Sequence, residues 1–183
     1  MRPIFLKNLL TSKEVFWLYR KLVELPFWQL NGNTARDDDP DRQHGSIAKA
    51  MIIKDNQSTQ TPMGVYGQSI PYRVNERLKE HRLEIPTNVE RFWINASFAG
   101  SRSLWPHHDD SDPRAFSIVL FLCPVWSEQW LGSFFCGGEE FKFSPGGAVV
   151  FQSPEMHTGD NPSLDCPYLR LTASIVTRRI ISK

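Results

Sequence analysis

Residues 91–98 read Arg-Phe-Trp-Ile-Asn-Ala-Ser-Phe, and this stretch decides the fold class. Phe92, Ile94, Ala96 and Phe98 occupy every second position, which is the period of a β-strand with two different faces. Glycine and proline punctuate the sequence that follows, as expected of turns between short strands. Further strands are predicted at 117–122, 133–135, 140–143, 148–152 and 168–177.

Two amphipathic helices are predicted before this run of strands. Thr11 and Glu14 have the spacing of a capping box, and apolar residues then recur at helical spacing until Pro26. Pro71 suits the first turn of a second helix, which would continue to Pro86. Helices followed by short strands predict a mainly β protein with N-terminal helices, of the α+β class, in which a β-sandwich or barrel carries helices on one face.

The chain has the length of a single domain, with 183 residues. We interpret 1–183 as one domain, in which residues 1–90 provide helical support and a lid region and residues 91–180 form the β core. The polar stretch at 31–69 is a candidate lid or a surface insertion, and the sequence leaves both open.

The charge balance restricts the partners. Lys and Arg number 21 against 20 Asp and Glu, for a net charge of +1, so there is no global basic field to attract nucleic acid. Three cysteines form no CxxC pair and indicate a reducing compartment. Because no membrane span or signal sequence is evident, we predict a soluble, cytoplasmic protein without a membrane partner.

The densest group of potential metal ligands is Pro106-His107-His108-Asp109-Asp110. Side chains two residues apart in extended chain share a face, so either His107 with Asp109 or His108 with Asp110 would direct an imidazole and a carboxylate to one point. His157, after the predicted strand at 148–152, could supply a third ligand. Two histidines and one carboxylate are typical of non-haem Fe(II) oxygenases, where open positions remain on the metal.

A second candidate site lies on the last predicted strand, where Arg170 and Thr172 share a face. A guanidinium with a hydroxyl beside it is well suited to bind a carboxylate. Pairing of Arg170 with a surface acid is the alternative interpretation.

From about Phe92 to Arg178 the sequence resembles the Fe(II)- and 2-oxoglutarate-dependent dioxygenases, particularly the compact prolyl 4-hydroxylase-like branch. The similar segments are NASFAGSRSLWPHHDD, RAFSIVLFLCPVW, WLGSFFCGGEEF, SPGGAVVFQSPEMHTG and YLRLTASI, and they follow one another in the family's order. The resemblance implies a double-stranded β-helix core, that is, a cupin-like jelly-roll. It also implies a hydroxylase that uses Fe(II), 2-oxoglutarate and O₂, with ascorbate as a candidate reductant, and that converts 2-oxoglutarate to succinate.

The resemblance further implies roles for single residues. His157 would be the distal iron ligand, and Arg170 with Thr172 would hold the far carboxylate of 2-oxoglutarate, with Asn95 as an additional contact. For the proximal pair, the position after Pro106 favours His107 and Asp109, whereas His108 and Asp110 match other members of the superfamily. No catalytic residue beyond the metal ligands is predicted.

The predicted substrate is a small molecule or an amino-acid side chain, free or in a peptide. One departure from the family is Phe98 or Phe121 at positions where members often carry tyrosine, because phenylalanine cannot donate a hydrogen bond to the co-substrate. A nucleic-acid dealkylating oxygenase is an alternative, disfavoured by the neutral charge and by the spacing of Arg178 and Arg179. A non-catalytic jelly-roll that binds a metal or ligand is another. The oligomeric state is left open.

Overall fold

The computed structural model describes residues 1–24, 29–31, 47–54, 57–58, 62–100 and 106–179. The large sheet contains β1 (Ile4–Leu6), β2 (Gln29–Asn31), β3 (Ile47–Lys54), β4 (Gln57–Ser58), β5 (Val89–Ser97), β6 (Ala115–Phe121), β9 (Ala148–Gln152) and β11 (Arg170–Arg178). The small sheet contains β7 (Phe134–Cys136), β8 (Glu139–Phe141) and β10 (His157–Gly159). The helices are α1 (Ser12–Val23) and α2 (Pro62–Leu78), with 3₁₀ turns η2 (Lys79–His81) and η3 (Glu128–Trp130).

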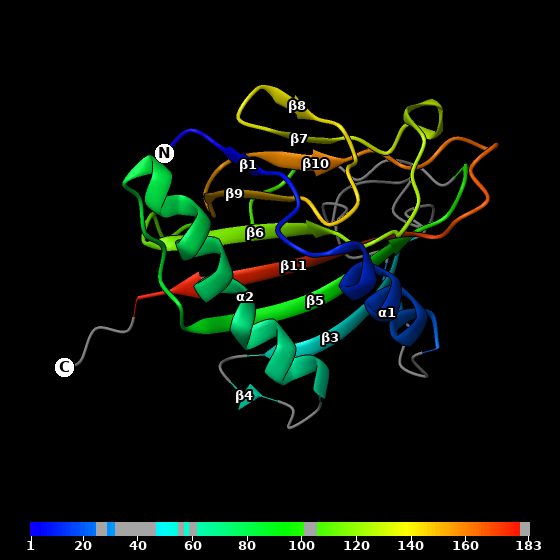
Figure 1. The fold of residues 1–183 in the computed structure, drawn as a ribbon. Helices are drawn as coiled ribbons and strands as arrows, with labels where there is room; N and C mark the ends of the chain where they lie inside the picture. Colours follow the sequence, from blue (N-terminus) through cyan, green and yellow to red (C-terminus); the bar gives the residue numbers. More distant parts are fainter. Residues whose placement is uncertain (25–28, 32–46, 55–56, 59–61, 101–105, 180–183) are drawn as a thin grey trace.

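The strands form two antiparallel sheets. The large sheet has the order β1-β9-β6-β11-β5-β3-β2, with β4 paired to β3, and the small sheet has the order β10-β7-β8 (Figure 1). Every strand pair is antiparallel, which is consistent with a jelly-roll and confirms the prediction of a mainly β protein. The large sheet takes strands from both parts of the chain, since β1 and β3 precede residue 91 and pair with β9 and β5.

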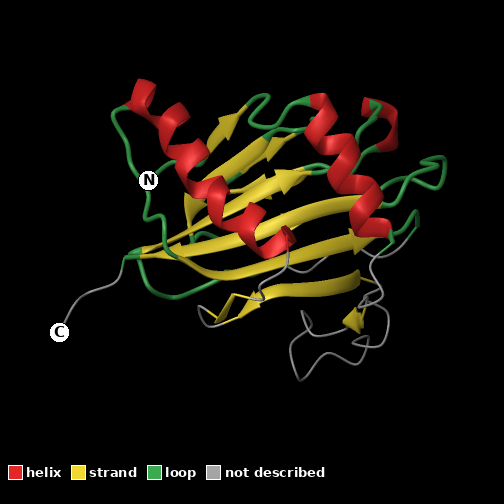
Figure 2. Ribbon diagram, turned by 60° about the horizontal axis from the view of Figure 1, so that its bottom comes forward, coloured by secondary structure: helices red, strands yellow, loops and turns green. Residues whose placement is uncertain are grey.

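Both helices lie across one face of the large sheet (Figure 2). Helix α1 begins where the sequence predicts, because Thr11 and Glu14 form the reciprocal hydrogen bonds of a capping box. Its residues Val15, Leu18 and Leu22 are buried against the sheet core. Each such buried side chain contributes about 1.5–3 kcal/mol, so packing rather than helix propensity holds α1 in place.

Helix α2 differs from the prediction. It begins at Pro62, which supplies the proline of the first turn, and Pro71 lies buried inside the helix. The start predicted at Pro71 is therefore wrong. A proline inside a helix removes one backbone hydrogen bond, and here the loss is offset by burial of the same helix face. On that face Gly67 approaches the sheet so closely that an added Cβ would lie 2.2 Å from the ring of Phe92.

The alternation in β5 separates the core from a second, more polar surface. Phe92, Ile94 and Ala96 are buried in the main hydrophobic core, whereas Phe98, the fourth residue of the predicted alternation, lies beyond the end of β5 and is exposed. Trp93, Asn95 and Ser97 point to the other face and line a cavity. The predicted lid at 31–69 falls partly on 32–46, 55–56 and 59–61, which lie outside the described residues; the remainder contributes to β2, β3, β4 and α2. Within the described chain, neither α1 nor α2 has the length and apolar character of a membrane-spanning helix.

Candidate active site

His107 and His157 face each other across a short antiparallel bridge between the loop that follows β5 and the first residue of β10. The backbone N–H of each histidine donates to the carbonyl of the other at 2.9 Å. Directly opposed residues in antiparallel chains carry their side chains on the same side. The two imidazole rings accordingly lie with their centroids 4.4 Å apart.

Asp109, which lies two residues after His107 in the same loop, is close to both histidines. His107, Asp109 and His157 each offer a ligand atom, and these atoms all lie within 4.8 Å of one another. Asp109 Oδ2 is 3.7 Å from His157 Nε2, and both side chains are only 4% exposed. Two imidazole nitrogens and one carboxylate oxygen at this spacing form a donor set that suits Fe(II) and leaves other coordination positions open.

Hydrogen bonds fix the orientation of two of these side chains. The Ser117 hydroxyl donates to Asp109 Oδ2 at 2.6 Å and lies 2.9 Å from the Ser153 hydroxyl. His157 Nδ1 lies 2.9 Å from the carbonyl oxygen of Glu155. Because a carbonyl can only accept, Nδ1 carries the proton and the Nε2 lone pair is left available for a metal.

The protonation state of His157 also suits a ligand. Burial lowers its pKa below the ordinary value of 6.5; the Asp109 carboxylate opposes this shift, and the neighbouring His107 reinforces it. A metal binds the neutral imidazole, so burial favours the ligand form.

The alternative pair from the sequence is directed elsewhere. Asp110 Oδ2 accepts hydrogen bonds from Arg91 at 2.8 Å and from Arg178. His108 is exposed, with Nδ1 3.4 Å from the sulfur of Met156. The structure therefore brings His107 and Asp109, and not His108 and Asp110, together with His157.

Arg170 is the first residue of β11, and its buried side chain lines the same cavity as the His-Asp-His cluster. Its Nε donates to the carbonyl of Gly132 at 2.9 Å, and the guanidinium lies 5.3 Å from the centre of the Phe143 ring. Within the described part of the chain, Nη2 is buried without a hydrogen-bond partner. Burial lowers the pKa of Arg170 from 12.5 to about 10. A buried cation with a free donor has the properties required to bind a carboxylate.

Two glycines leave space for this guanidinium. A Cβ added at Gly132 would lie 3.2 Å from Arg170 Cδ and Nε, and one added at Gly159 would lie 3.3 Å from Nη2. Gly132 also has φ +80°, a conformation that other residues rarely adopt. These two positions form a cradle around the arginine head that a side chain would fill.

The other predicted co-substrate residues lie beside Arg170. Thr172 pairs with Asn95 across the β5–β11 ladder, and both line the cavity. The cavity receives residues from β5, β6 and β11 of the large sheet and from β7 and β10 of the small sheet. It therefore lies between the two sheets, with the metal-type cluster and the arginine in one space.

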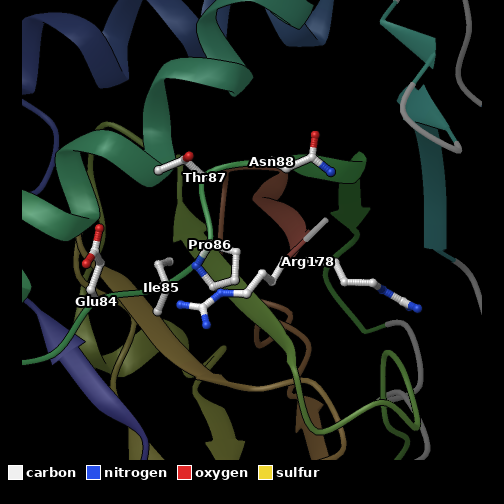
Figure 3. A pocket seen from close by; sticks show the side chains of 7 residues that line it. Glu84, Ile85, Pro86, Thr87, Asn88 and Arg178 are labelled. Carbon is white, nitrogen blue, oxygen red and sulfur yellow. The ribbon is translucent and has the colours of Figure 1, made fainter. Parts of the chain in front are cut away.

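A separate pocket of about 340 Å³ lies at the other end of β11. It is formed by residues 84–88 together with Arg178 and Arg179 (Figure 3). Its lining contains one carboxylate, Glu84, and no histidine or cysteine, so it lacks the metal-ligand set of the cavity between the sheets.

The sequence did not identify the groups that support the ligands. Ser117 interrupts an otherwise apolar strand, and Ser153 follows another, AVVFQ. Both are fully buried, and a buried hydroxyl needs a hydrogen-bond partner. A serine inside an apolar strand was thus the available signal, although its partner could not be inferred without the sheet pairing.

No protein-family model matches the sequence, and no curated protein matches it. Solved structures do match. A prolyl-4-hydroxylase from Pseudomonas putida is 19% identical, with 97% of this chain and 92% of that chain covered and a TM-score of 0.65. An oxidoreductase of the 2OG-Fe(II) oxygenase family from Burkholderia pseudomallei is 17% identical, covering 97% and 85%, with a TM-score of 0.67. The chain has the fold of the 2OG-Fe(II) oxygenases.

A prolyl hydroxylase from Trichoplax adhaerens, solved with a peptide fragment of the hypoxia-inducible factor oxygen degradation domain, has the same 2OG-Fe(II) oxygenase-like fold. It is 19% identical, with 96% of this chain and 83% of that chain covered and a TM-score of 0.64. At this level of identity the similarity establishes the fold, and the chemistry has to be argued from the residues of the site.

Proposed function

We propose that this protein is an Fe(II)- and 2-oxoglutarate-dependent dioxygenase built as a single domain on a cupin-like double-stranded β-helix. The reaction would hydroxylate an unactivated C–H bond and convert 2-oxoglutarate to succinate and CO₂. One observation carries the proposal: a His-Asp-His cluster, with His157 buried and His107 and Asp109 partly buried, shares one cavity with a buried guanidinium whose Nη2 has no hydrogen-bond partner in the described chain.

The donor set and the cradle both fit the two groups that the fold implies. His107, Asp109 and His157 would hold iron through two nitrogens and one carboxylate oxygen. Arg170 would hold the far carboxylate of 2-oxoglutarate in the space between Gly132 and Gly159. Thr172 and Asn95, which lie beside the arginine, would provide further polar contacts to the co-substrate.

Iron and 2-oxoglutarate, when bound, supply the activation of O₂ and the oxidation of the substrate. The protein supplies position and exclusion of water. Ser117 holds the Asp109 carboxylate and the Glu155 carbonyl holds the His157 ring, so both ligands are oriented before a metal arrives. Arg170, fixed by the Gly132 carbonyl, orients the co-substrate by its far end.

The proposed substrate is a small molecule or an amino-acid side chain, free or in a peptide, and residues 31–69 remain a candidate lid over it. Nucleic-acid dealkylation is not favoured by the site. Arg178, one of the basic residues at the end of the chain, forms ion pairs with Glu90 and Asp110. Its charge is thereby occupied by carboxylates of this protein rather than presented to phosphate.

Succinate formation tests the proposal. Purified protein supplied with Fe(II), 2-oxoglutarate and O₂ should release succinate slowly without substrate and faster with the correct substrate. His157→Ala should abolish this release, because one of three ligands is lost. His81→Ala is the matched control, since His81 is exposed on η2. A protein that binds metal but forms no succinate with any candidate substrate would instead be a non-catalytic jelly-roll.

A further inference from the structure

The loop that carries His107 and Asp109 is attached to the large sheet by two arginines. Arg91, on β5, donates from Nη2 to the backbone carbonyl oxygen of Asp109 at 3.0 Å and to Asp110 Oδ2 at 2.8 Å. Arg178, at the end of β11, donates to the same Asp110 oxygen. We propose that Arg91 is a positioning residue that, through the Asp109 carbonyl and through Asp110, holds the metal-ligand carboxylate of Asp109 in place, an inference that rests on the proposed function.

The two arginines are brought together by strand pairing. Arg91 pairs with Val176 in the β5–β11 ladder, and the backbone N–H of Arg178 donates to the carbonyl of Asn88, next to the start of β5. Strands in a sheet interior are rigid supports compared with a loop. A contact from these strands therefore transfers the rigidity of the sheet to the ligand loop.

The loop has a second set of attachments on its other side. The backbone N–H groups of Asp109 and Asp110 donate to the Ser153 carbonyl at 3.1 and 3.3 Å, and Ser117 donates to the Asp109 side chain. Arg91 adds the contact to the carbonyl of Asp109, so the residue is held through its N–H, its carbonyl and its carboxylate. Asp110 contributes by fixing the Arg91 guanidinium, because its Oδ2 accepts from Nη2 of both Arg91 and Arg178.

The burial of these groups makes the contacts effective. The side chains of Arg91 and Asp110 are 25% and 15% exposed, and Arg91 also lies 5.6 Å from the ring centre of Trp93, which lines the cavity. Partly buried charged hydrogen bonds are stronger than exposed ion pairs. The two consecutive aspartates therefore have different roles: Asp109 faces the metal site, and Asp110 anchors the loop.

Co(II) titration measures this role directly, because its visible d–d absorption reports both affinity and coordination geometry without turnover. Arg91→Met should weaken Co(II) binding about 10-fold or more, as is usual when a group that orients a metal ligand is removed. Arg91→Lys keeps the charge but not the planar guanidinium that lies beside the Trp93 ring and donates from Nη2 to both acceptors, so it should recover only part of the affinity. Asp110→Asn should weaken binding in the same direction. Unfolding in urea, followed in parallel, establishes that each variant is folded.

Arg73→Met is the matched control. Arg73 on α2 forms an ion pair with Glu14 on α1 at 2.6 Å, and neither residue lines the cavity. Its loss should leave Co(II) affinity and spectrum unchanged. Wild-type affinity and spectrum in Arg91→Met would overturn the positioning role while leaving the proposed function intact. A wild-type protein that binds no Co(II) would overturn the metal site itself and this inference with it.

Discussion

Replacing Arg170 with methionine should weaken 2-oxoglutarate binding about 100-fold while changing the stability of the free protein by no more than about 2 kcal/mol. These two effects are separable because Arg170 is buried, its Nη2 has no hydrogen-bond partner in the described chain, and burial outweighs the Asp160 carboxylate in its effect on the Arg170 pKa. Its charge therefore has a cost in the free protein that a bound anion would reduce. Methionine is unbranched, reaches as far as the arginine Nε and carries no charge.

The cost in the free protein follows from the pKa. Burial lowers the Arg170 pKa from 12.5 to about 10, which corresponds to about 3 kcal/mol against the charged form. Because the Arg170 pKa is lower in the folded state than in the unfolded state, the buried charge lowers the free energy of unfolding at every pH below about 10, including neutral pH. This loss of stability disappears only as the pH rises above about 10 and the arginine becomes neutral.

Methionine also removes favourable contacts of the arginine. The hydrogen bond from Nε to the Gly132 carbonyl contributes about 1.5–3 kcal/mol and the buried contact with the Phe143 ring about 2 kcal/mol. These gains slightly exceed the burial cost. We therefore expect metal-free Arg170→Met to be destabilised by at most about 2 kcal/mol relative to wild type.

Urea unfolding with Mn(II) and 2-oxoglutarate measures both effects. At a concentration about 100 times the wild-type Kd, the ligand should stabilise wild type by about 2.7 kcal/mol. At that concentration a 100-fold weaker variant gains only about 0.4 kcal/mol. Arg114→Met, which removes an exposed arginine paired with Asp112, should behave as wild type. Full stabilisation of Arg170→Met by 2-oxoglutarate would refute the assignment of Arg170 to the co-substrate.

Two further predictions follow from burial and backbone geometry. Gly132→Ala should weaken 2-oxoglutarate binding more than Gly138→Ala, because both residues have φ near +80° but only at Gly132 does an added Cβ approach Arg170, at 3.2 Å. Equal affinities of the two variants in the same titration would contradict this. Burial raises the Cys123 pKa from 9.0 to about 12, so between these values the unfolded thiol releases its proton and the folded one does not. Titration of this thiol should therefore lower the free energy of unfolding by about 1.4 kcal/mol per pH unit as the pH rises between these values. In urea unfolding, the free energy of unfolding of Cys123→Ala should fall correspondingly less with pH.

Features encoded by neighbouring residues were predictable from the sequence. The start of α1 depends on Thr11 and Glu14 alone, and both form the expected capping hydrogen bonds. The two faces of β5 follow from its alternation, with Ile94 in the core and Asn95 on the cavity. Pro71 shows the limit of such local rules, because burial against the sheet keeps it inside α2.

The choice between the two His-Asp pairs could not be made from local spacing. His107 with Asp109 and His108 with Asp110 have the same period, so either could share a face. What separates them lies far away in the chain: Ser117 donates to the carboxylate of the first aspartate, and Arg91 donates to the carboxylate of the second. The same limit applies to β10, whose sequence His-Thr-Gly carries no apolar signal and which is stabilised as a strand by its pairing with β7.

The central claim is that iron and 2-oxoglutarate occupy one cavity of this protein, and anaerobic titration with visible spectroscopy tests it most directly. Fe(II) and 2-oxoglutarate together should produce a weak charge-transfer band that neither produces alone, and His157→Ala should lose it. A wild-type protein that shows no band and no affinity for 2-oxoglutarate would contradict the account.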